Sequence, residues 1–122
     1  MKTLLQTEEV AQLVLGLLGL YYQPIHFSVW LWIILFLSPD FSMLGYLINT
    51  RIGAYAYNLF HHKFIAILIA IIGFYMHNDT TLLVGILLFA HSCFDRVWGY
   101  GLKYTDSFQH THLGKIGKAA QE

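Results

Sequence analysis

The chain alternates between long apolar runs and short polar breaks. Each apolar run predicts a helix, and the runs cover residues 10–22, 27–37, 65–76 and 82–94. Each run is shorter than the roughly 20 residues that a helix needs to cross a bilayer, so polar flanking residues must complete each span. The pattern predicts an all-α fold, an integral membrane bundle of about four transmembrane helices.

The breaks between the runs set the expected ends of the helices. Pro24 separates the first two helices, and Pro39 is expected to stop the second, because proline cannot donate an interior helical hydrogen bond. Residues 41–50 are then a short connector, either re-entrant or interfacial. One long helix is expected over residues 51–76, and a last helix over residues 81–98.

The amino-acid composition adds that the helices are expected to lie in a membrane. Of the 122 residues, 57% are hydrophobic and 11% are charged, whereas an average soluble domain carries about 25% charged residues. A soluble domain of this size could not bury so much apolar surface. The net charge is zero with histidine neutral, and no basic stripe indicates nucleic acid. The lipid bilayer is the expected partner, and a thin bundle of four short helices favours a homo-oligomer.

The positive residues predict the orientation in the membrane. Four helices place both termini on one side, and that side carries Lys2, Arg51, Arg96, Lys103, Lys115 and Lys118. The opposite turns, near Pro24 and Asn78, contain no Lys or Arg. Positive residues favour the cytoplasm, which predicts a multi-pass protein of the inner (plasma) membrane with both termini cytoplasmic. Residues 1–102 are the expected transmembrane helical domain and residues 103–122 a polar cytoplasmic tail.

A few polar side chains lie at or inside the hydrophobic segments, where ionisable groups are costly and usually functional. Asn58 and His61 are three residues apart, and His91 and Asp95 are four apart, so each pair shares a helix face. The predicted topology places both pairs, and Asp40, in or near the same half of the membrane. Imidazole and carboxylate ligands suit zinc, manganese or iron. The pattern predicts a divalent-metal site with these ligands: Asp40, His61, His91 and Asp95.

The same side chains also suit two roles without an enzyme. They would hold helices together by hydrogen-bonding each other, or His61 and His91 would flank a haem between the third and fourth helices. Among the neighbouring residues, Cys93 is expected to pack as a small apolar side chain. Lys63 is expected to pair with an acid or extend to the membrane surface. Tyr57 is expected to line a helix contact, with a catalytic role as the less favoured interpretation.

Four stretches carry a resemblance to a known family. They are Ser-Pro-Asp-Phe-Ser-Met-Leu-Gly-Tyr at 38–46, Tyr-Asn-Leu-Phe-His at 57–61, the two motifs at 91–96 and 99–104, and Thr-His-Leu-Gly at 111–114. Together the stretches resemble a family of small bacterial integral-membrane proteins classed as domain of unknown function 4260. The resemblance covers nearly the whole chain, and the family's name implies no activity.

A more distant resemblance points to chemistry. The order Pro-Asp, then Arg and a downstream His, then His-x-x-x-Asp followed by Gly is similar to the membrane-bound metal-dependent hydrolases. The corresponding positions here are Asp40, Arg51, His61, His91 and Asp95. The resemblance implies that the acids and histidines among them bind metal.

The chain departs from that pattern at two places. Ser42 stands where a second acid is typical, and Tyr57-Asn58 replaces a His-Arg pair. One or two ligands are then missing, or are supplied by Asn58 or His112.

The leading hypothesis is a metal-dependent hydrolase that acts at the cytoplasmic face, with a phospholipid or another amphiphile as substrate. Asn58 and His112 are the expected catalytic residues near the substrate. The alternative is a non-enzymatic small integral membrane protein that is structural, a transporter or haem-binding.

Overall fold

The computed structural model describes residues 1–98, 101–102, 110–111 and 113–115. Its elements are α1 (Lys2–Tyr21), α2 (Val29–Leu37), the 3-10 helix η1 (Ser38–Leu47), α3 (Thr50–His61), α4 (Lys63–Tyr75), α5 (Asp79–Val97), β1 (His110–Thr111) and β2 (Gly114–Lys115). The two short strands pair antiparallel. Apart from them, the described elements are helical, as the all-α prediction requires.

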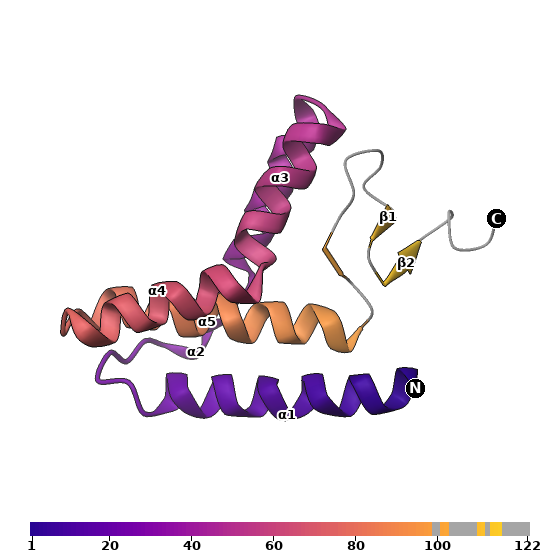
Figure 1. Ribbon diagram of the computed structural model, residues 1–122. Coiled ribbons are helices and arrows are strands. Elements are labelled where there is room, and N and C mark those ends of the chain that lie inside the picture. Colours follow the sequence, from indigo (N-terminus) through magenta and orange to yellow (C-terminus); the bar gives the residue numbers. More distant parts are fainter. Residues whose placement is uncertain (99–100, 103–109, 112, 116–122) are drawn as a thin grey trace.

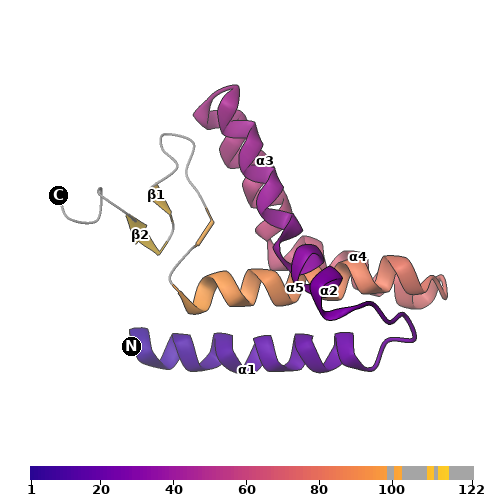
Figure 2. The same cartoon turned by 180° about the vertical axis from the view of Figure 1, so that it is seen from behind.

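Helix α5 is the centre of the fold. Figure 1 shows α1, α4 and α5 lying side by side, while η1 and α3 form a hairpin that leans away from them, and Figure 2 shows the same arrangement from behind. The start of α1 lies beside the end of α5, where Gln6 Nε2 donates a hydrogen bond to the Val97 carbonyl at 3.1 Å. These two helix ends therefore lie at the same end of the bundle.

Small residues allow α5 to approach both of its neighbours closely. A side chain at Gly85 would meet the backbone of Ala70 on α4, and a Cβ at Gly16 on α1 would lie 3.0 Å from the Cβ of Ala90. Close backbone approach through small residues is typical of helix packing in membranes. The core that forms around this contact contains Leu20, Leu83, Leu87 and Ala90.

The α-helix ends at Leu37, just before Pro39, as predicted, but the chain stays helical beyond it. Helix α2 continues directly into η1, and Pro39 lies in the first turn of η1. Proline is tolerated in a first turn because the N–H that it lacks would have no helical partner there. Most of the expected connector is consequently helical.

The prediction of one long helix over residues 51–76 was wrong. The helix breaks at His62, where φ is −91° and ψ is 117°, and α3 and α4 meet at a bend of 47°. The bend allows two polar residues on either side of His62 to reach different partners. The side chain of His61 contacts Asp40, whereas that of Lys63 turns back to Glu9 on α1.

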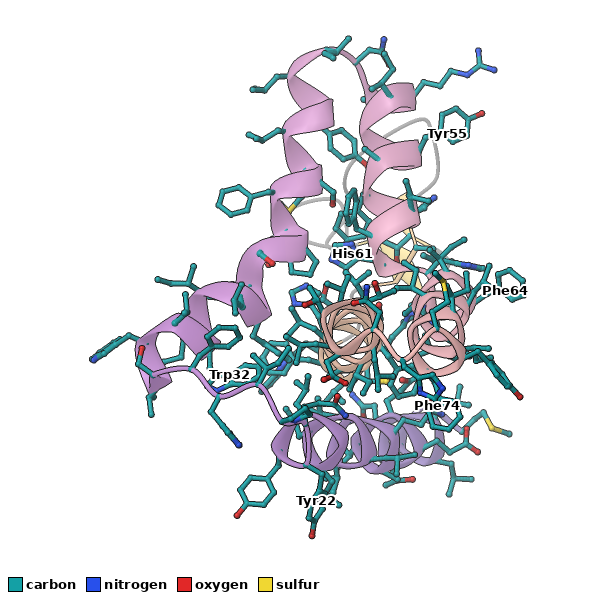
Figure 3. All side chains as sticks on the ribbon, turned by 90° about the vertical axis from the view of Figure 1, so that its left-hand side faces the viewer. Tyr22, Trp32, Tyr55, His61, Phe64 and Phe74 are labelled. Carbon is teal, nitrogen blue, oxygen red and sulfur yellow. The ribbon has the colours of Figure 1, made fainter. Side chains whose placement is uncertain are left out.

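Within the described part of the chain, two helical segments are long and apolar enough to cross a membrane. They are Val29–Leu47 and Asp79–Val97, and the bent pair of α3 and α4 makes a third if it is counted as one span. Large apolar side chains are exposed along them. Phe64 and Phe74, each 65% exposed, point outward in Figure 3. Extended exposed apolar surface marks contact with a membrane or a partner, and together these features indicate a membrane protein. The four predicted spans are not confirmed by this count, since α1 is not among them.

Candidate metal centre

Three elements bring four ligating side chains to one point. Asp40 comes from η1, His61 from the last turn of α3, and His91 and Asp95 from α5. One candidate ligand atom of each residue lies within 4.8 Å of the other three. Figure 3 shows His61 pointing to the place where α3 meets α5. The structure thus brings together all four residues that the sequence predicts as ligands.

The spacing of the four atoms fits a metal ion. His61 Nε2 and His91 Nε2 are 3.1 Å apart. Asp40 Oδ1 lies 3.3 and 3.1 Å from these nitrogens, and Asp95 Oδ2 lies 3.1 and 3.4 Å from them. A tetrahedral zinc ion with bonds of 2.0–2.1 Å places its ligand atoms about 3.3 Å apart. Five of the six edges of such a tetrahedron therefore have the required length.

Backbone carbonyls determine which ring nitrogens face the centre. His61 Nδ1 lies 2.8 Å from the Tyr57 carbonyl, and His91 Nδ1 lies 2.6 Å from the Phe36 carbonyl. A carbonyl oxygen only accepts, so each Nδ1 carries the hydrogen and donates it. Each neutral imidazole then presents the lone pair of Nε2 to the centre. Metal-ligating histidines typically have such a carbonyl partner.

With both imidazoles neutral, this arrangement of donors is unfavourable without a cation. The lone pairs of the two Nε2 atoms then face each other at 3.1 Å, and two carboxylate oxygens adjoin them. Lone pairs and negative charge that converge in a low-dielectric interior repel each other strongly. A divalent cation bound between them would turn that repulsion into coordination. The residues present therefore fit a metal ion.

Tyr57 supports the centre at three points. Its hydroxyl donates to Asp95 Oδ2 at 3.3 Å, and its ring stacks on that of His61 with centroids 3.8 Å apart and planes 6° apart. Its carbonyl accepts the His61 Nδ1 hydrogen. Sequence reasoning missed this role, and the available signal was the four-residue spacing of Tyr57 and His61. The carbonyl of Phe36 left no comparable signal.

The centre is open on one side. The side chains of His61 and His91 are 3% and 1% exposed, and that of Asp95 is 13% exposed. The side chain of Asp40 is 43% exposed. A water molecule or a substrate would therefore reach the centre beside Asp40.

The other predicted site residues lie elsewhere or outside the described residues. Asn58 is half-buried on α3 and is not one of the four clustered residues. Arg51 is exposed in the first turn of α3, ten residues and so about 15 Å along the helix from His61. His112 lies outside the residues that the structure describes. Catalytic roles for Asn58 and His112 stay predictions.

A second polar cluster lies on the other side of the helix break. Lys63 forms an ion pair with Glu9 and donates a hydrogen bond to Gln12 Oε1 at 2.7 Å. Cys93 is fully buried, with its sulfur 3.8 Å from the same Gln12 oxygen. Of the two roles expected for Lys63, the structure shows the pair with an acid, and the cluster joins α1 to the start of α4.

A family model described as "Domain of unknown function (DUF4260)" matches residues 2–116. The chain belongs to this family. No curated protein and no solved structure matches the chain. The description of this family names no activity. The geometry of the centre is therefore the basis for the proposed function.

Proposed function

We propose that the chain is a membrane-embedded, metal-dependent hydrolase. The observation that carries the proposal is the pair of Nε2 atoms 3.1 Å apart, each held with its lone pair toward two carboxylate oxygens. The proposed site is at the cytoplasmic face of the inner (plasma) membrane, and the proposed substrate is an amphiphile such as a phospholipid. Self-association of this thin bundle is part of the same proposal.

The donor set favours a transition metal. Two imidazole nitrogens and two carboxylate oxygens suit zinc, manganese or iron, whereas magnesium prefers six oxygen ligands and retains several waters. Among the three, the near-tetrahedral spacing favours zinc.

Different residues of the chain would bind the ion and admit the substrate. A divalent ion supplies Lewis acidity, which polarises a carbonyl or phosphoryl oxygen and makes water a better nucleophile at neutral pH. His61, His91 and Asp95 would hold the ion from the buried side and exclude bulk water there. The exposed flank of Asp40 would admit the polar group of a substrate. Asn58 and His112 are the proposed substrate-side residues.

The proposed topology has four spans with both termini in the cytoplasm. Helix α1 is the fourth span, because 20 residues at 1.5 Å per residue measure about 30 Å, the thickness of the hydrocarbon core. Two observations support the shared side of the termini. The start of α1 lies beside the end of α5, and the turns near Pro24 and Asn78 carry no Lys or Arg.

A structural metal centre is the second candidate function. Four protein ligands close a tetrahedron, as in structural zinc sites, whereas catalytic sites usually leave one position open. The partial exposure of Asp40 favours catalysis, because the other three ligands would still hold an ion if its carboxylate moved away. Haem fits less well, since nitrogens 3.1 Å apart leave no room for a macrocycle between the two rings.

Metal content tests the proposal directly. The wild-type protein, purified in detergent without chelator, is expected to hold about one equivalent of zinc, manganese or iron by mass spectrometry. His91→Ala is expected to lose it, because a buried ligand is removed. His77→Asn is the matched control, since His77 is exposed in a turn with φ of 52°, a conformation that asparagine tolerates.

Two results would count against the proposal. Wild-type protein without metal, or His91→Ala protein that keeps its metal, would exclude the assigned centre. A screen of fluorogenic esters and phosphodiesters then separates the two candidate functions. Turnover that rises and falls with metal content supports the hydrolase, and stoichiometric metal without turnover supports the structural role.

A further inference from the structure

An apolar cavity opens at the exposed ligand of the centre. It has a volume of about 390 Å³ and is lined by Asp40 together with Leu37, Phe41, Met43, Leu44 and Leu47. A ligand of the proposed metal is therefore its one ionisable lining residue, and the rest of the lining is hydrocarbon or thioether. Small-molecule sites typically combine a mostly apolar wall with a few polar groups in this way.

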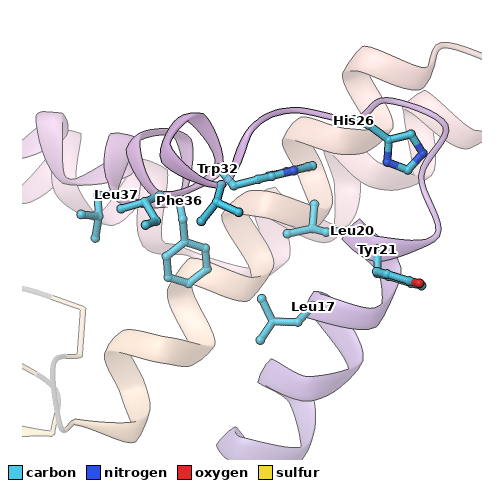
Figure 4. Close-up of a pocket in the computed structure, with 9 residues that line it drawn as sticks. Leu17, Leu20, Tyr21, His26, Trp32, Phe36 and Leu37 are labelled. Atoms are coloured by element: carbon cyan, nitrogen blue, oxygen red, sulfur yellow. The ribbon is translucent and has the colours of Figure 1, made fainter.

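A second apolar cavity continues along helix α2. It has a volume of about 450 Å³ and lies between the end of α1 and one face of α2. Figure 4 shows Leu17 and Leu20 of α1 lying opposite Trp32 and Phe36 of α2. Leu37 lines both cavities, so the two adjoin at this side chain. We call the two cavities together the apolar path; its lining residues run from Asp40 on η1 along α2.

The surroundings of the path indicate what fills it. It follows Val29–Leu47, a segment long and apolar enough to cross a membrane and almost unburied within the protein. Apart from Tyr21 and His26 in the second cavity, the walls are apolar along their length. A hydrocarbon chain matches such walls, because it carries no polar group that would be buried without a hydrogen-bond partner. The polar end of that molecule would lie at Asp40, next to the centre.

We infer that this path binds one hydrocarbon chain of an amphiphile whose anionic or ester head group lies at the metal centre. The inference rests on the proposed function and assigns the place where the hydrocarbon chain of its substrate would bind. It also assigns specificity to residues that do not touch the metal. Leu37 lies where the two cavities meet, and Ile33, about one turn earlier, lines only the second.

Cobalt-substituted protein with a series of alkyl phosphates tests the inference without turnover. Cobalt replaces zinc and reports binding at the centre through its visible absorption. Dodecyl phosphate is expected to change the spectrum at concentrations at least about tenfold lower than ethyl phosphate, since two buried methylene groups suffice for a factor of ten. Leu37→Trp is expected to remove this chain-length advantage, and Ile33→Trp to reduce it for dodecyl but not for butyl phosphate.

Ile34→Trp is the matched control. Ile34 lies on the same helix and is 61% exposed, but it lines neither cavity. Partition of long chains into detergent micelles affects all variants equally. A chain-length advantage that survives unchanged in both Leu37→Trp and Ile33→Trp would overturn the inference and leave the metal centre standing. Wild-type protein that binds no cobalt would overturn the proposed function, and the inference with it.

Discussion

At the scale of single residues, the centre depends on groups that hold the ligands in place. His61 and His91 each donate Nδ1–H to a backbone carbonyl, so their tautomers are fixed before any ion binds. Tyr57 adds a ring that stacks on His61 and a hydroxyl that donates to Asp95. A preorganised ligand set loses less conformational entropy when the ion binds.

Tyr57→Phe tests this support. The change keeps the stacked ring and the backbone carbonyl but removes the hydrogen bond to Asp95. Since outer-shell partners typically contribute about 10–100-fold to metal affinity, zinc affinity is expected to fall by about tenfold in competition with a chromophoric chelator. Tyr55→Phe is the control, because Tyr55 is exposed on the same helix. Equal affinities of the two variants would contradict a positioning role for Tyr57.

The sequence predicts the ligands better than their supports. His91 and Asp95 are recognisable because their four-residue spacing places both on one helix face inside an apolar run. His61 and Asp40 are recognisable because ionisable groups are rare in such segments. The carbonyl of Phe36 cannot be recognised in the sequence, because every residue has a carbonyl and only the folded structure brings this one to His91.

At the scale of the elements, the break at His62 is the main feature that the apolar pattern did not predict. Hydrophobic periodicity continues through it, so one long helix was expected. Tertiary contacts on both sides favour the break instead, with His61 drawn to the centre and Lys63 to Glu9. At Pro39 the α-helix ends as expected, but the chain continues as the 3-10 helix η1, because proline is tolerated in a first helical turn.

Glu9→Gln tests the contribution of the Lys63 pair to the packing of α1 against α4. The side chains of Lys63 and Glu9 are 19% and 18% exposed, so removing the acid leaves a largely buried cation without its counter-charge. We expect the free energy of unfolding to fall by up to about 3 kcal/mol. The measurement is the thermal midpoint of detergent-solubilised protein.

Glu8→Gln is the control for this prediction, because Glu8 is exposed one residue away. The control is expected to match wild type. If the two variants have the same midpoint as each other, the ion pair does not hold the helices together.

At the scale of the whole molecule, the role of α1 sets how many times the chain crosses the membrane. The described helices include two or three spans, and α1 decides whether there is a fourth. The ends of α1 answer this question, because a helix that spans has its ends on opposite sides of the membrane.

Cysteine labelling in oriented vesicles makes the measurement. In a Cys93→Ala background, Glu8→Cys and Thr50→Cys are expected to react from the cytoplasmic side. His26→Cys and Thr80→Cys are expected to react from the opposite side, and all four positions are exposed. Labelling of Glu8→Cys and His26→Cys from the same side would mean that α1 does not cross.

The order of the ligands along the chain has a consequence for biogenesis. Asp40, His61 and the pair His91 and Asp95 lie on three elements, and the pair belongs to α5, the last of the five α-helices described. A nascent chain cannot complete the centre until α5 has emerged and inserted. Binding of the ion would therefore be the final step of assembly. A cell that withholds the metal would accumulate protein that is fully inserted but in which no ion joins η1, α3 and α5.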